Sequence, residues 1–162
     1  MQKISPFLWF NNQAEEAAKF YVSVFKNSKL GSIARYDEAA AAAAGQRVGS
    51  VMTVSFKLNG QEFTALNGGP IFNFTPAISF VVNCRTQAEV DRLWDALSAG
   101  GEPGQCGWLR DKYGVSWQIV PTILPRLLTD RDPVKSGRVM QAILTMNKID
   151  IAALKAAYGR KN

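Results

Sequence analysis

The sequence of 162 residues contains no histidine, only two cysteines and no long apolar run. Without histidine the chain lacks the commonest metal ligand and general base, and nucleophilic catalysis of the cysteine–histidine kind is excluded. Cys84 and Cys106 are too few for a disulfide framework, so we expect buried structural thiols in a reducing cytoplasm. The first residues, MQKISP, have no apolar segment of the secretory type, and the sequence predicts neither a leader nor a membrane partner.

The composition predicts one soluble domain over 1–162, since 47% of the residues are hydrophobic and 20% are charged. The net charge is 19 − 13 = +6, yet the basic residues are scattered and their only run is Arg160-Lys161. A nucleic-acid footprint gathers basic side chains on one face. We therefore expect no nucleic-acid partner.

A loose internal repeat organises the chain. PFLWFNN and QAEEAAKFY, from Pro6, return from Ala77 as AISFVVN and QAEVDRLW after an inserted CRT. Both copies predict a strand followed by a helix that opens with Gln-Ala-Glu, and a repeat of this size indicates two like modules facing each other across a cleft. Each helix has a predicted cap and a glutamate three residues later, Asn12 with Glu15 and Thr86 with Glu89.

Hydrophobic alternation predicts the same element order in both copies. Asn59-Gly60 between two alternating runs is a strong hairpin signal. The six alanines of 38–45 predict a short helix or connector. The strands of the first module are predicted at 4–10, 30–36, 49–58 and 61–66. The second module is predicted to have strands at 77–83, 102–105, 108–111 and 115–121, with a helix at 86–98.

The chain becomes helical beyond Pro121, with helices predicted at 122–130, 133–146 and 150–158. The apolar stripe of the middle helix requires burial against its own sheet or a partner subunit, so we expect a homodimer. The fold class is α+β. It comprises two βαβββ modules, about 1–70 and 76–121, and a helical appendix, 122–162.

The end motifs add a family resemblance. TALNGGP at 64–70, GQCGWLRDKYGVSWQIVP at 104–121 and the helical appendix resemble the PhnB-like family, often labelled demethylubiquinone methyltransferase-like. That family falls within the vicinal oxygen chelate superfamily of glyoxalase I, bleomycin-resistance proteins and extradiol dioxygenases. The resemblance implies a glyoxalase-like pair of half-barrels, and in catalytic members a metal bound by four inward side chains.

Carried over residue by residue, three of the four metal-ligand positions implied by the resemblance fall at Pro6, Ala77 and Gln118. The fourth falls at Leu66 or Asn67. Proline and alanine offer no donor atom and glutamine offers a neutral amide, whereas a catalytic divalent site needs about three anionic or imidazole donors. We therefore expect no metal and no other cofactor. Gln118 is interpreted as a cavity-lining amide that bonds a neighbouring strand or a ligand.

The methyltransferase label does not agree with the residues. A Rossmann-type methyltransferase needs a glycine-rich turn after its first strand, where this chain has Asn11-Asn12. Glu62, Glu102 and Asp111 show no paired-carboxylate spacing, and Asp111 is expected to hold the turn before Gly114. Catalysis stays open, with an isomerase, dioxygenase or methyltransferase of atypical site as the alternative.

Strand alternation divides the remaining side chains into cavity and core. With Pro6 and Ala77 facing inward, Phe7, Trp9, Ile78, Phe80, Trp117 and Ile119 are predicted to be core. Such a cavity suits a small, partly aromatic molecule bound without a metal, although a filled barrel interior has the same composition. The predicted lining includes Val81 and the candidate site residues Leu8, Phe10, Leu66, Asn67, Ser79, Trp108, Ser116 and Gln118.

Overall fold

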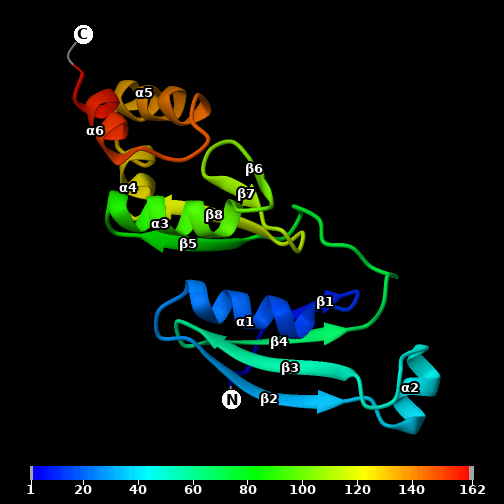
Figure 1. The fold of residues 1–162 in the computed structure, drawn as a ribbon. Helices are drawn as coiled ribbons and strands as arrows, with labels where there is room; N and C mark the ends of the chain where they lie inside the picture. The colour runs from blue at the N-terminus through cyan, green and yellow to red at the C-terminus, as the bar shows by residue number, and fades with distance from the viewer. Residues whose placement is uncertain (1, 161–162) are drawn as a thin grey trace. The chain divides into compact units, whose positions relative to one another are not determined.

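A computed structural model describes residues 2–160. The chain divides into two compact units, one ending at Phe74 and the other beginning at Thr75. Each unit has one four-stranded sheet with a long helix along one face, α1 in the first and α3 in the second (Figure 1). The strand orders, β1-β4-β3-β2 and β5-β8-β7-β6, are equivalent. This equivalence confirms the two βαβββ modules, while the arrangement of their half-barrels stays a prediction.

The first sheet carries its core on the face covered by α1. Tyr21 of α1 stacks on Phe56, and Phe56 stacks on Phe63 across the strand pair. Asn59 and Gly60 connect that pair in the left-handed conformation that the predicted hairpin turn requires. The elements of this unit are β1 (Phe7–Phe10), α1 (Ala14–Val24), β2 (Lys29–Arg35), α2 (Glu38–Ala44), β3 (Val51–Leu58) and β4 (Gln61–Asn67).

The cap of α1 differs from the prediction. The helix begins after Gln13, which makes no side-chain cap, and the amide of Ala14 instead donates to Asn67 Oδ1 at 2.8 Å. The Asn67 amide nitrogen donates in turn to the carbonyl of Val51 at 3.1 Å. The predicted cap at Asn12 is therefore wrong, because a buried side chain from a distant strand takes its place.

The second unit repeats this plan with a locally made cap. Thr86 accepts a hydrogen bond from the Glu89 amide, as predicted. Leu93 and Leu97 of α3 are fully buried together with Ile119 of the sheet beneath. The elements of this module are β5 (Phe80–Cys84), α3 (Gln87–Ser98), β6 (Glu102–Pro103), β7 (Trp108–Arg110) and β8 (Ser116–Pro121).

Asp111 organises the turn between β7 and β8. Its buried carboxylate accepts from the amides of Tyr113 and Val115, at 2.9 and 3.0 Å, and from the indole nitrogen of Trp117 at 2.8 Å. Gly114 follows in the left-handed region. The sequence-based assignment of Asp111 to this turn is confirmed.

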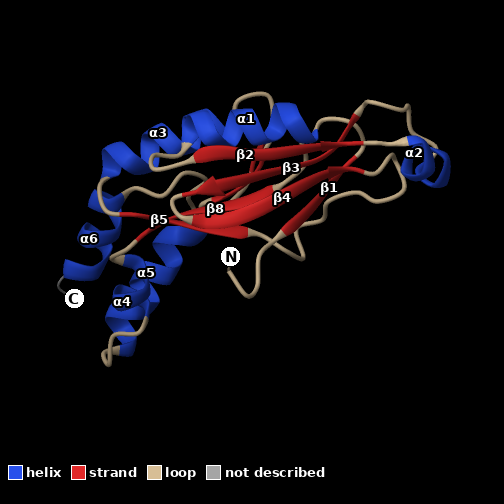
Figure 2. Cartoon of the chain, turned by 90° about the horizontal axis from the view of Figure 1, so that it is seen from below, coloured by secondary structure: helices blue, strands red, loops and turns tan. Residues whose placement is uncertain are grey.

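The appendix forms three helices beside one another, α4 (Leu124–Leu128), α5 (Pro133–Leu144) and α6 (Ile151–Gly159) (Figure 2). Their shared core also packs against Val120 of β8 and Cys106 of the loop before β7. That loop is held by backbone bonds, since Cys106 and Gly107 donate their amides to Met146 and Asn147. Every helix among residues 2–160 is too short or too polar to cross a membrane. The buried members of the shared core are Leu124, Leu127, Val139, Ile143, Ile149 and Leu154.

Candidate functional site

Each sheet has one face covered by its own helix and one face opposite that helix, which we call its open face. In the first module the structure reverses the predicted assignment of β1. Leu8 and Phe10 are buried on the α1 side, where Leu8 pairs with the fully buried Ala65. Phe7 is 61% exposed and lies with Trp9 on the open face. Leu8 and Phe10 are therefore core residues, contrary to the prediction.

The connector after β4 explains the position of Trp9. Its indole nitrogen donates to the carbonyl of Gly69 at 2.9 Å, and its ring packs edge-on against Phe72. A side chain at Gly68 would collide with the Trp9 ring. Asn67 points to the α1 side, where it caps the helix, so it does not line an open face, while Leu66 lies on the open face beside Trp9.

In the second module the predicted faces agree with the structure along β8. Trp117 and Ile119 are buried on the α3 side, and Gln118 lies between them on the open face. Gln118 donates its amide nitrogen to the Ser79 hydroxyl at 2.9 Å, so the predicted hydrogen bond to a neighbouring segment is present, while its place in a cavity stays a prediction. Val81 pairs with Gln118 on the same face. Ile78, predicted to be core, is 75% exposed because it precedes β5.

A hollow of about 330 Å³ lies on this open face, and we call it the Trp108 pocket. Two predicted site residues, Trp108 and Ser116, line it. The register places Trp108 opposite Gln118 and Arg110 opposite Ser116, so the Ser79–Gln118 pair adjoins the pocket. The full lining is Pro76, Glu102, Pro103, Gly104, Trp108, Leu109, Arg110 and Ser116.

Arg110 is a pocket residue that the sequence analysis missed. Its guanidinium pairs with the carboxylate of Glu102, its cross-strand partner on β6. The segment WLRD at 108–111 contains the information that identifies Arg110. Side chains two residues apart on a strand lie on the same face, so Arg110 must share a face with Trp108. Of the predicted set, Ser79, Trp108, Ser116 and Gln118 are brought together here. Leu8, Phe10, Leu66 and Asn67 belong to the first module.

The residues do not fit the divalent metal of the superfamily's catalytic members. Pro6 and Ala77 supply no donor, and the Gln118 amide already bonds Ser79. Among residues 2–160 no group of three or more histidine, cysteine, aspartate or glutamate side chains is placed to hold a metal ion.

Neither cysteine is placed as a nucleophile. Burial raises the pKa of the Cys84 thiol to about 11, so its thiolate is scarce at neutral pH. Cys106 is half-buried, and its sulfur lies 3.6 Å from the carbonyl of Ile143. Both thiols therefore serve packing.

A methyl-donor cofactor also lacks a fit at the start of α1. The turn after β1 contains no glycine, and the first helical amide already has a partner, since Ala14 donates to Asn67 Oδ1. The glycine-rich turn that brings the backbone close to such a cofactor is therefore missing between β1 and α1.

Two βαβββ modules of equivalent strand order define a protein of the glyoxalase-like class. A family model described as 3-demethylubiquinone-9 3-methyltransferase matches residues 2–120, and the chain belongs to this PhnB-like family, as the end motifs predicted. The helices from Leu124 onward lie beyond the matched residues.

Solved structures agree with the family assignment. The PhnB protein from Bacillus cereus is 41% identical, with a TM-score of 0.65, and the match covers 75% of this chain and all of that one. Protein PA1353 from Pseudomonas aeruginosa shares the fold at 19% identity and a TM-score of 0.59, over 75% of this chain and 98% of that one. A comparison with proteins of curated function finds no match.

Proposed function

We propose that the chain binds a small, partly aromatic molecule in the Trp108 pocket, without a metal. The observation that carries the proposal is the convergence of an indole, a guanidinium and hydroxyls on one hollow open face. Mostly apolar walls with a few oriented polar groups are typical of small-molecule sites. Trp108 supplies a flat apolar surface for a ring, and Ser116 and the Ser79–Gln118 pair supply the polar contacts.

Arg110 suits an anionic substituent on that ring. Its present partner, Glu102, is exposed, with side-chain exposures of 48% for Arg110 and 69% for Glu102. An exposed ion pair contributes little, so a ligand carboxylate can replace Glu102 at small cost. The planar guanidinium also binds carboxylates in bidentate geometry. The proposed ligand class is therefore aromatic carboxylates.

A thermal-shift comparison tests this binding, because a ligand of the folded state raises the melting temperature by mass action. We expect 4-hydroxybenzoate to raise it more than 4-hydroxybenzyl alcohol, with no change when Mn, Zn, Ni or Fe is added. Trp108→Ala and Arg110→Met should each reduce the affinity about tenfold. Gln141→Leu, at an exposed position of α5, is the control. Equal binding by Trp108→Ala and the control would refute the site.

We also propose that the protein is a cytoplasmic homodimer to which α5 contributes a contact. Met140 and Leu144, one turn apart on this helix, are exposed at 45% and 59% although the helix buries Val139 and Ile143. A double change to glutamate at Met140 and Leu144 should convert dimer to monomer in light scattering, since charge would be buried at the contact. Ala152→Glu on α6 is the matched control. A dimer that survives the double change would show that α5 does not contribute to the dimer contact.

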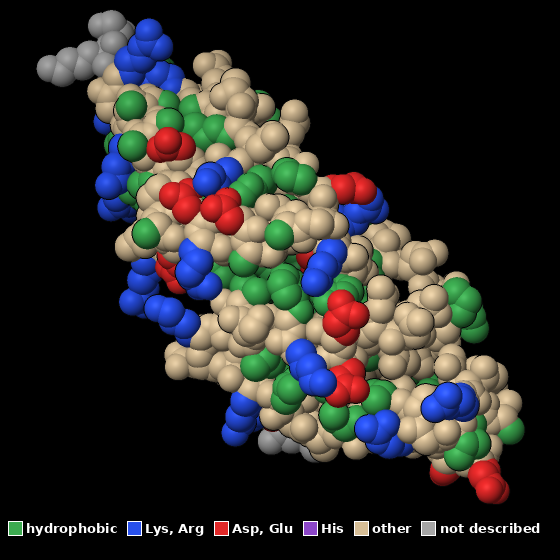
Figure 3. Space-filling view, viewed as in Figure 1, with side chains coloured by type: hydrophobic (Ala, Val, Ile, Leu, Met, Phe, Trp, Pro, Cys, Tyr) green, Lys and Arg blue, Asp and Glu red, His purple; other side chains and the backbone are tan. Residues whose placement is uncertain are grey.

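The face shown in Figure 3 has no basic area of the kind that nucleic-acid binding needs. Lys and Arg side chains are interspersed there with Asp and Glu and form no continuous basic area. A nucleic-acid footprint would need such an area. The expectation of no nucleic-acid partner is retained as part of the proposal.

A further inference from the structure

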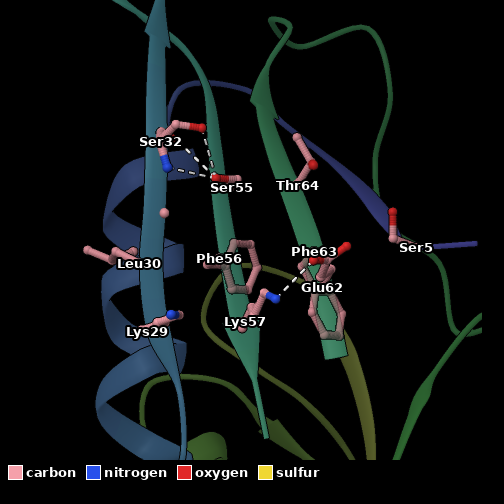
Figure 4. A pocket seen from close by; sticks show the side chains of 11 residues that line it. Ser5, Lys29, Leu30, Ser32, Ser55, Phe56, Lys57, Glu62, Phe63 and Thr64 are labelled. Atoms are coloured by element: carbon pink, nitrogen blue, oxygen red, sulfur yellow. Dashed lines mark hydrogen bonds and ion pairs between the residues drawn. The ribbon is translucent and has the colours of Figure 1, made fainter. Parts of the chain in front are cut away.

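A second hollow, which we call the Lys57 groove, lies wholly within the first module and has a volume of about 490 Å³ (Figure 4). Its polar side chains come from β2, β3, β4 and the segment before β1. Ser55 and Lys57 alternate along β3 with the buried Phe56, which places both on the open face. No function proposed above uses these residues.

The charges in the groove are unbalanced. Lys29 and Lys57 are direct cross-strand partners, and like charges in that position destabilise a sheet. Glu62, the partner of Lys57 on the other side, offsets one of them through an ion pair of 3.0 Å. Lys29 forms no ion pair with any of the residues that the structure describes. The three side chains therefore leave one positive charge.

Glu62 is held as an anion in this arrangement. The amide of Gln2 donates to it at 2.8 Å, and this bond together with the Lys57 ammonium holds the pKa of Glu62 below its usual range. Glu62 therefore engages Lys57 throughout the neutral range. Lys29 is the cation left for a ligand.

Hydroxyl groups line the rest of the groove. Ser55 and Thr64 are cross-strand partners on β3 and β4. Ser55 Oγ accepts from the Ser32 amide at 2.8 Å and lies 3.1 Å from Ser32 Oγ. Gly31 leaves the space open, because a side chain there would collide with the Ser55 hydroxyl. The irregular pairing of β2 between Leu30 and Ile33 produces this local geometry.

We propose that the Lys57 groove binds a small polyhydroxylated monoanion. Lys29 contacts the anionic group, and Ser5, Ser32, Ser55 and Thr64 exchange hydrogen bonds with the hydroxyls. One uncompensated ammonium matches one negative charge, and hydroxyl groups both donate to and accept from a polyol. The Lys57 groove is lined by residues of the first module and the Trp108 pocket by residues of the second, and the two linings share no residue.

Isothermal titration calorimetry with three matched probes tests the proposal. Gluconate carries the anion and the hydroxyls, sorbitol carries the hydroxyls alone, and inorganic phosphate carries charge alone. We expect one gluconate to bind per chain, and we expect sorbitol and phosphate to bind with at least about tenfold lower affinity. Lys29→Met should weaken gluconate about tenfold, and Ser55→Ala roughly threefold.

Two control variants make the result decisive. Lys26→Met removes an equal charge from an exposed position outside the groove and should leave gluconate binding unchanged. Trp108→Ala should also leave it unchanged, which separates this site from the proposed aromatic site. Circular dichroism checks that Lys29→Met stays folded. The proposal is overturned if gluconate does not bind, if phosphate binds as tightly, or if Lys26→Met loses as much affinity as Lys29→Met.

Discussion

Replacing Asp111 by alanine is expected to lower the free energy of unfolding by about 3 kcal/mol or more, because three donors, two of them buried, lose their acceptor. Asp111 is 3% exposed, and its carboxylate accepts from Tyr113, Val115 and Trp117. Hydrogen bonds to a charged acceptor contribute more than neutral ones. Urea unfolding followed by tryptophan fluorescence measures the change.

The individual bonds of Asp111 are separable by milder variants. Asp111→Asn keeps an oxygen for the two backbone amides but turns an amide group toward the Trp117 indole, so its loss should be smaller, about 1–2 kcal/mol. A double-mutant cycle with Trp117→Phe isolates that contact. Asp95→Ala, at an exposed helix position, is the matched control. An Asp111→Ala protein as stable as this control would contradict the assignment.

Asp111→Ala should also lower the affinity of the Trp108 pocket for aromatic carboxylates. The turn joins β7 to β8, and their pairing sets Trp108 opposite Gln118 and Arg110 opposite Ser116. Loosening the turn separates the walls of the Trp108 pocket. Gluconate affinity in the first module should stay unchanged in the same protein.

Replacing Asn67 by alanine is expected to destabilise the protein by about 2–3 kcal/mol, because a buried helix cap and a strand contact are lost together. The side chain accepts from Ala14 and donates to Val51. The backbone carbonyl of Asn67 accepts from the Tyr36 hydroxyl at 2.6 Å, and the substitution leaves that acceptor in place. Unfolding by denaturant measures this change. The slope of the free energy of unfolding against denaturant concentration is compared between variants.

Asn12→Ala is the informative control, since Asn12 is the residue that sequence reasoning chose as the cap. We expect its effect to stay within about 0.5 kcal/mol. Asn67→Asp should not restore stability, because it keeps the acceptor for Ala14 but faces the Val51 carbonyl with a carboxylate. A larger loss for Asn12→Ala than for Asn67→Ala would reverse our account of α1.

Local signals predicted the elements well. Asn59-Gly60 marked the hairpin of β3 and β4, and Thr86 marked the start of α3. These signals act over a few residues, through left-handed backbone or a side chain that accepts a nearby amide. The prediction of Asn12 as the cap was wrong because the cap of α1 is Asn67, 53 residues beyond Ala14 in the sequence.

The faces of β1 show a different limit. Alternation divides side chains into two sets, but does not say which set meets the helix. With Pro6 placed inward from a family position, alternation predicts that Phe10 lines a cavity. In the structure Leu8 and Phe10 join the aromatic core beneath α1. In the second module the same reasoning placed Trp117 and Ile119 correctly.

The Lys57 groove was partly predictable from the sequence. Lys57 and Glu62 stand at equal distances from the Asn59-Gly60 turn, so their cross-strand pairing follows from the hairpin register. The pairing of Lys29 with Lys57 does not follow from the hairpin. It depends on the register in which β2 joins β3, and α2 separates these two strands in the sequence. The hollow at Gly31 depends on that same pairing.

The sequence by itself determined the repeat, the element order, the family and the lack of the expected metal donors at Pro6, Ala77 and Gln118. These properties follow from residue types and short spacings. Only the tertiary structure decided that Asn67 caps α1, that Leu8 and Phe10 are core, and that polar side chains gather in the Trp108 pocket and the Lys57 groove. Each of these outcomes depends on contacts between residues far apart in the chain, whose register no local pattern specifies.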